Sequence, residues 1–193
     1  MTELEEAVRE MKVNTAPGPD GFSTVFFKNF WQQERGDIFE MLQQLGQLDI
    51  ARLNYGILVL LPKIKGDNQI KQFRPIYLLN VIYKIMTKVL TIRLNAIINK
   101  VISVAQTTFI PGIYILDGVL IIHEILQELR VKKKRGIILK LDFLKAYDKV
   151  NWSFLQDVLK KKKFDPKWLE WILRVVQGGQ NSCQSEWGAW TVF

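Results

Sequence analysis

Hydrophobic residues recur every three or four positions along most of this chain, a spacing that predicts amphipathic helices. The pattern covers residues 3–12, 22–47, 79–101 and 114–131. Between the first two stretches, Ala-Pro-Gly-Pro-Asp-Gly at 16–21 predicts a tight turn, because proline and glycine interrupt helices. Most of the first two-thirds of the chain is therefore expected to be helical.

Two capping signals predict further helices after residue 150. Asn151 is a favourable N-cap for a helix through Lys163. Asp165-Pro166 supplies the cap and the first position of another helix, which Gly178-Gly179 is expected to end. The tail at 181–193 shows no pattern that assigns it to an element.

Strand patterns occur in two places. Residues 57–61 form a short, branched apolar run closed by Pro62, and with the polar loop 65–68 and the segment 73–76 they predict a β-hairpin with a basic tip. After Gly136 the apolar residues alternate, which predicts a strand over 137–143. That strand would carry the Asp142 carboxylate at its end, on the face away from the main apolar row.

Basic residues outnumber acidic ones, with 27 Lys and Arg against 19 Asp and Glu, and the formal charge is +8. Such a charge attracts polyanions and favours nucleic acid as the partner. The one cysteine, Cys183, excludes an intramolecular disulfide, the first residues lack the features of a secretory signal, and no apolar run reaches the ~20 residues of a membrane span. We therefore expect an intracellular protein of the nucleus or cytoplasm, not secreted and with no membrane partner.

Four short motif blocks follow one another in the sequence. They are Ala16–Phe22, then Leu60–Lys63 with Phe73–Ile76, then Gln106–Gly112, and finally Leu139–Asp148. In this order and at these separations they resemble the reverse transcriptases of non-LTR, LINE-like retrotransposons of the plant type. Any one block is a weak signal, but together they make coincidence a poor explanation.

The resemblance implies an α+β fold, namely the helix-rich fingers and incomplete palm of a right-hand polymerase (reverse transcriptase). On this interpretation residues 1–193 are one partial reverse transcriptase domain. Residues 1–135 would form the fingers, 136–180 would begin the palm, and 181–193 would be an unassigned tail.

The resemblance also implies roles for individual side chains. Asp142 would be a catalytic carboxylate that binds Mg²⁺, Tyr147 would lie under the sugar of the incoming dNTP, and Lys63 and Arg74 would grip its triphosphate. Each also has a structural interpretation. Asp142 is then a solvated residue at a strand end, Tyr147 packs in a core, and the two cations are ordinary surface charges.

Two loops and two basic runs complete the candidate site. By resemblance, Gly18, Asp20, Gly21, Gln106 and Gly112 shape the backbone near the RNA template and the DNA primer. The runs Lys132–Arg135 and Lys160–Lys163 are solvated faces or phosphate-binding surfaces, and the sequence leaves both interpretations open.

The family pattern is incomplete in this chain. In the family the palm continues into an aromatic-x-Asp-Asp turn with the remaining metal carboxylate, and no such turn occurs before Phe193. We therefore expect a fragment of an RNA-directed DNA polymerase that is inactive alone, because a two-metal site needs all its carboxylates and the thumb is missing too. The alternative is a non-catalytic, basic nucleic-acid-binding remnant.

Overall fold

The computed structural model describes residues 1–64, 69, 72–103, 106, 110, 112–139 and 149–183, with side chains as far as residue 177. The chain forms two compact units, residues 1–92 with 156–193, and residues 93–155. The helices and strands of the first unit are α1 (Thr2–Glu10), α2 (Thr24–Asn29), α3 (Trp31–Gln43), α4 (Ile50–Leu53), β1 (Gly56–Pro62), β2 (Phe73–Leu79) and α9 (Pro166–Cys183). Helices α6 (Ile98–Val101) and α7 (Ile115–Val131) lie in the second unit, and the unit boundaries fall within α5 (Val81–Asn95) and α8 (Trp152–Lys161).

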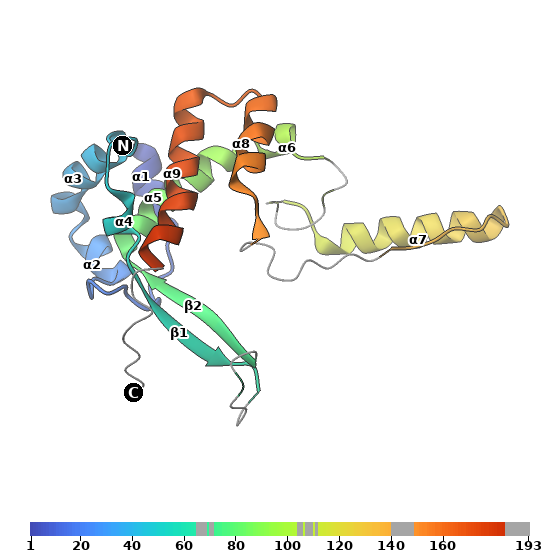
Figure 1. Ribbon diagram of the computed structural model, residues 1–193, viewed down its shortest axis with the longest axis horizontal. Helices are drawn as coiled ribbons and strands as arrows, with labels where there is room; N and C mark the ends of the chain where they lie inside the picture. The colour runs from blue at the N-terminus through green and yellow to red at the C-terminus, as the bar shows by residue number, and fades with distance from the viewer. Residues whose placement is uncertain are drawn as a thin grey trace. The chain divides into compact units, whose positions relative to one another are not determined.

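The first unit is built around an apolar core. Its buried side chains come from α1, α2, α3 and α5 and from the segment around α4, and they are Leu4, Ala7, Val8, Phe27, Ile38, Leu42, Leu45, Ile50, Val81, Tyr83, Ile85, Met86, Val89 and Leu90. Helix α9 lies beside α4 and α5 (Figure 1), and its Trp168 and Trp171 pack against the core. The Tyr83 hydroxyl donates a 3.0 Å hydrogen bond to the carbonyl of Val175, which ties α5 to α9.

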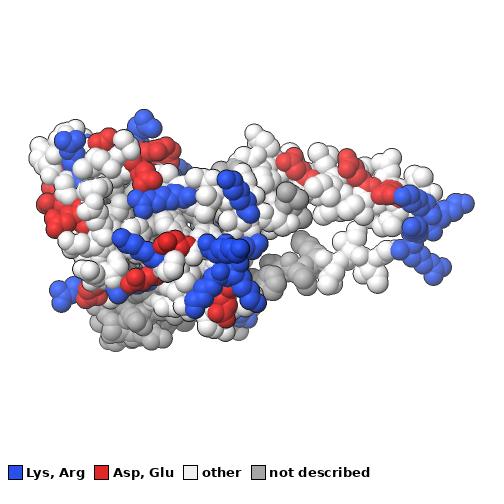
Figure 2. All heavy atoms as spheres, turned by 90° about the horizontal axis from the view of Figure 1, so that it is seen from above, with Lys and Arg blue, Asp and Glu red and all other residues white. Residues whose placement is uncertain are grey.

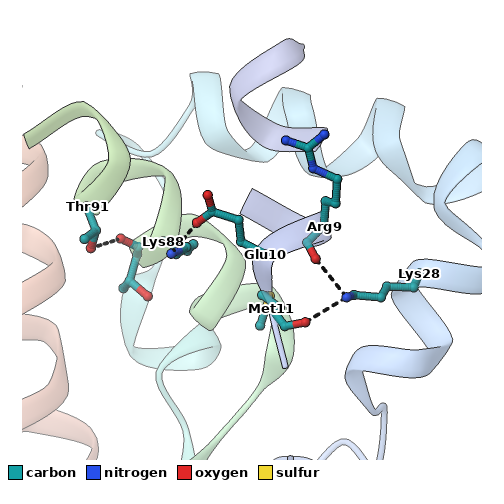
Figure 3. A network of polar contacts seen from close by, with 7 residues as sticks. Arg9, Glu10, Met11, Lys28, Lys88 and Thr91 are labelled. Carbon is teal, nitrogen blue, oxygen red and sulfur yellow. Dashed lines mark hydrogen bonds and ion pairs between the residues drawn. The ribbon is translucent and has the colours of Figure 1, made fainter. Parts of the chain in front are cut away.

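Two lysines hold the end of α1 in place (Figure 3). Lys28 Nζ donates to the carbonyl oxygens of Arg9 at 3.0 Å and Met11 at 2.7 Å, which would otherwise lack partners at the helix end. Lys88 Nζ lies 2.7 Å from Glu10 Oε2, and this hydrogen bond and its charge lower the pKa of Glu10. Helix α1 is thereby fixed to both α2 and α5.

The predicted helices at 3–12 and 114–131 are confirmed by α1 and α7. Both later caps are confirmed as well, since Asn151 Oδ1 accepts from the Phe154 N–H at 3.1 Å and Asp165 Oδ1 accepts from the Lys167 N–H at 2.8 Å. The predicted stop at Gly178-Gly179 is wrong, because α9 continues to Cys183. A helical glycine costs only about 1 kcal/mol, which need not end a helix.

Two long predicted helices are each divided. The stretch 22–47 breaks at Phe30 into α2 and α3, and the rings of Phe22, Phe26 and Phe30 lie against one another with centroids 4.7 and 4.9 Å apart. The stretch 79–101 ends its main helix at Asn95 and resumes as the short α6. Asparagine favours turns because its side chain competes for backbone hydrogen bonds.

The two strands of the predicted hairpin are confirmed, and the predicted basic tip at 65–68 lies outside the described residues. Strands β1 and β2 pair antiparallel from Gly56↔Leu79 to Pro62↔Phe73 (Figure 1). The strand predicted at 137–143 is wrong as far as it is described, since residues 137–139 are irregular and Ile137 is 98% exposed. An isolated strand lacks the ladder that stabilises it, and the only sheet within the described ranges is the β1–β2 pair. Residues 140–143 lie outside the described residues.

In the second unit, none of the residues of α7 is buried. The segment after it returns along the helix, where a Cβ placed on Gly136 would lie 2.9 Å from Leu129 Cδ1. A search of the described helices finds no candidate for a membrane span. Within the described ranges the fold is helix-rich with one small two-stranded sheet, which agrees with the predicted α+β class.

Candidate functional site

Lys63 and Arg74 are brought together by the register of the hairpin. Arg74 pairs with Leu61, and the Lys63 N–H donates a 2.7 Å bond to the Gln72 carbonyl, which extends the ladder by one step. Residues directly opposite each other in an antiparallel pair lie on the same face, and alternate residues of one strand share it too. The register thus places both cations on one face as diagonal neighbours, and both are exposed.

The predicted turn at 16–21 is present. The Gly21 N–H donates to the Gly18 carbonyl at 3.0 Å, and Asp20 Oδ1 accepts from the Phe22 N–H at 3.1 Å. Gly21 has φ +75°, a left-handed conformation in which a side chain is strained. Nothing lies within 4 Å of the position of its missing Cβ, so Gly21 serves the backbone conformation and not a close contact within the described part of the chain.

Asn80 anchors this turn to the junction of β2 and α5. Its Oδ1 accepts a 3.3 Å hydrogen bond from the Asp20 N–H. A Cβ on Gly18 would lie 2.4 Å from the same oxygen and 2.6 Å from the carbonyl carbon of Leu79. The backbone at Gly18 therefore lies close to the start of α5, and its predicted place near template and primer stays a prediction.

Lys84, in the first helical turn of α5, binds the first residue of the 16–21 segment. Its Nζ donates to the Ala16 carbonyl at 3.2 Å. Partial burial lowers the pKa of Lys84, and the nearby Asp20 carboxylate opposes that effect. The sequence analysis selected neither Lys84 nor Asn80, although a lone polar residue between a predicted strand and a predicted helix is a signal of a helix N-cap.

Gln106 and Gly112 belong to the second unit. The Gln106 N–H donates to the Ser103 carbonyl at 3.0 Å, and Gly112 has φ +81°. The loop between them is described only in part, so the structure assigns the positive φ of Gly112 to a turn and gives no further geometry for this pair.

Asp142 and Tyr147 lie outside the described residues, and nothing can be measured at either. Within the described ranges no three His, Cys, Asp or Glu side chains gather into a possible metal site. The described residues therefore supply the cations and the backbone turns of the candidate site, and its carboxylate and aromatic parts remain predictions.

Comparison with known proteins shows the protein family. Residues 62–191 match the family model of the reverse transcriptase (RNA-dependent DNA polymerase), which covers most of the chain. The chain belongs to this reverse transcriptase family.

The most informative relatives are proteins of non-LTR retrotransposons, and they confirm the resemblance. The chain is 32% identical over 97% of its length to the transposon TX1 uncharacterized 149 kDa protein of Xenopus laevis, of which it covers 14%. It is 26% identical over 86% of its length to the Pol polyprotein from the type-1 retrotransposable element R2 of Nasonia vitripennis, covering 16% of that protein. It is 22% identical over 96% of its length to the Pol polyprotein from the type-2 retrotransposable element R2DM of Drosophila melanogaster, covering 17% of that protein. The chain thus spans only about one-sixth of the length of these relatives.

Proposed function

We propose that this chain forms the fingers and the start of the palm of an RNA-directed DNA polymerase of a non-LTR retrotransposon. The observation that carries the proposal is the hairpin register, which puts Lys63 and Arg74 on one exposed face. Both residues also stand in the motif block that resembles the triphosphate-binding part of the family.

The chemistry of this face suits a triphosphate. Diagonal neighbours across an antiparallel pair lie roughly 7–8 Å apart, which two long side chains can span around a chain of phosphates. A planar guanidinium offers two parallel hydrogen bonds to phosphate oxygens, and an ammonium offers a compact charge. Arg74 would orient the phosphates and Lys63 would neutralise them.

The remaining parts of the site are proposed from the resemblance alone. Asp142 would supply one carboxylate for Mg²⁺, which when bound activates the primer hydroxyl and holds the triphosphate. Tyr147 would exclude a ribose 2′-hydroxyl by contact.

Binding of dTTP in the presence of Mg²⁺ tests the role of the hairpin. Lys63→Ala and Arg74→Ala should each weaken binding about tenfold or more, since a hydrogen bond to a charged group is worth roughly 1.5–3 kcal/mol. Lys12→Ala is the charge-matched control, because Lys12 is exposed and distant in sequence from the hairpin. An equal loss in the control would show that only net charge matters and would overturn the proposal.

Primer extension on an RNA template with Mg²⁺ tests the predicted silence of the chain alone. We expect no product, because the chain contains no aromatic-x-Asp-Asp segment to complete a two-metal site. Extension that disappears in Asp142→Ala would contradict the silence while supporting the role of Asp142. If neither extension nor dTTP binding occurs but RNA–DNA duplexes bind with a steep salt dependence, the non-catalytic remnant is the better description.

A further inference from the structure

Helix α8 ends in a reversal that has a lysine where glycine is usual. The Lys163 N–H donates to the Lys160 carbonyl at 2.9 Å, and the Phe164 N–H donates to the Leu159 carbonyl at 3.2 Å. Lys163 itself has φ +60°. This pair of hydrogen bonds with a left-handed residue is the Schellman motif, whose left-handed position is most often glycine because a Cβ there is strained.

Helix α7 ends with the same motif. The Lys133 N–H donates to the Arg130 carbonyl at 3.1 Å, the Lys134 N–H donates to the Leu129 carbonyl at 2.9 Å, and Lys133 has φ +50°. The two ends therefore share a backbone geometry and a strained lysine within a basic run, so one serves as a control for the other.

Each basic run has an acid one helical turn earlier, Asp157 before Lys161 and Glu128 before Lys132, but the two runs differ in their ion pairs. Lys132 forms an ion pair with Glu128 one turn earlier. No ion pair joins Lys160, Lys161, Lys162 or Lys163 to a carboxylate of the described chain, and all four are exposed. The nearest acid in the following segment, Asp165, is occupied in capping α9 through the N–H groups of Lys167 and Trp168.

A fifth cation stands next to the α8 turn. Lys167 is exposed in the first turn of α9, and its Nζ lies 5.5 Å from the centroid of the Trp171 ring. Figure 2 shows Lys and Arg gathered in two groups on this face, with acidic side chains beside both groups and mixed with basic ones elsewhere. Attraction to the negative end of a helix accounts for lysines in the last turn of α8, and it gives no reason for a lysine in place of glycine at the strained position.

We propose that Lys160–Lys163 and Lys167 form a binding site for the phosphate backbone of a nucleic-acid duplex, separate from the triphosphate face of the hairpin. The reversal at Lys163 spreads consecutive ammonium groups around the helix end, where each can meet a different phosphate. Lysine is a point charge and reads no sequence, so the site holds a duplex without selecting it. This inference rests on the proposed polymerase function for its choice of a nucleic-acid duplex as the ligand.

The test measures binding of the full chain to a mixed-sequence RNA–DNA duplex over a range of salt concentrations, without dNTP. Lys163→Gly should weaken binding and reduce the slope of log affinity against log salt by about one unit, as the loss of one phosphate contact does. Glycine suits the left-handed position, so the same variant should unfold at an equal or higher temperature than the parent.

Lys133→Gly is the matched control, with the same charge change in the same backbone motif. We expect a clearly smaller change in its salt slope. An equal reduction in both variants, or an unchanged slope in Lys163→Gly, would overturn the proposal. Binding of dTTP by the hairpin is measured in a separate assay, so its failure would leave the duplex result to be judged independently.

Discussion

Helices α5 and α7 are both long and rich in apolar residues, but α5 has buried side chains in the core and α7 has none buried. Six of the 15 residues of α5 are buried, and none of the 17 residues of α7 is. Seven apolar residues of α7 are 47–70% exposed, namely Ile115, Leu116, Val119, Leu120, Ile121, Ile122 and Ile125. Apolar content thus predicts that a segment is helical, but a partner segment decides whether its side chains leave water.

The difference between the helices lies in what covers them. Helix α5 is joined to α1 through Lys88, to α9 through Tyr83, and to the turn at 16–21 through Lys84. In α7 no residue is buried, although the segment around Gly136 lies against the helix at Leu129. Polar residues in α5 are therefore attachment points, whereas the apolar residues of α7 contribute little burial.

The largest expected effect is a truncation in the covered helix. Ile85 is fully buried in α5, so Ile85→Ala removes buried methyl groups and leaves a cavity. We expect it to lower the free energy of unfolding by about 2–5 kcal/mol. Urea unfolding followed by tryptophan fluorescence measures this, because Trp31, Trp168 and Trp171 pack against the same core.

The matched truncation in the exposed helix is Ile122→Ala. Ile122 is 51% exposed, and alanine is the better helix former, so the free energy of unfolding should change by no more than about 0.5 kcal/mol. A loss as large as that of Ile85→Ala would mean that the face of α7 is covered, and the contrast between the helices would fail.

Local signals predicted much of this fold. The hairpin, the caps at Asn151 and Asp165 and the helices α1 and α7 depend on short-range spacing and turn chemistry, which the sequence displays directly. The break at Phe30 was not predicted, because it depends on how the phenylalanine rings meet in three dimensions. The period-two pattern after Gly136 was also misleading, because a strand needs a partner strand and residues 137–139 have none within the described chain.

In the candidate site, too, some residues could be predicted from the sequence and others could not. Motif spacing selected Lys63, Arg74 and the turn at 16–21, and the roles of these residues stay predictions. The family match covers residues 62–191, which include the hairpin cations but not the turn. Motif spacing did not select Asn80, whose contact with Asp20 spans 60 residues of sequence and forms only when the turn at 16–21 packs against the junction of β2 and α5. The left-handed lysines at 133 and 163 were also missed, because a backbone angle is not encoded by one residue type.

A substitution with a smaller expected effect than Ile85→Ala tests the packing of the turn at 16–21 against the start of α5. Gly18→Ala would place a Cβ 2.5 Å from the Asn80 nitrogen and 2.6 Å from the Leu79 carbonyl carbon, and neither backbone atom can move aside easily. We expect a loss of about 1–3 kcal/mol in the free energy of unfolding, as for other overpacked sites. Gly36→Ala is the control, since Gly36 lies within α3 with nothing within 4 Å of its missing Cβ, and it should gain up to about 1 kcal/mol. The same urea titration reports both, and a Gly18→Ala protein as stable as the parent would mean that the turn does not pack closely on the start of α5.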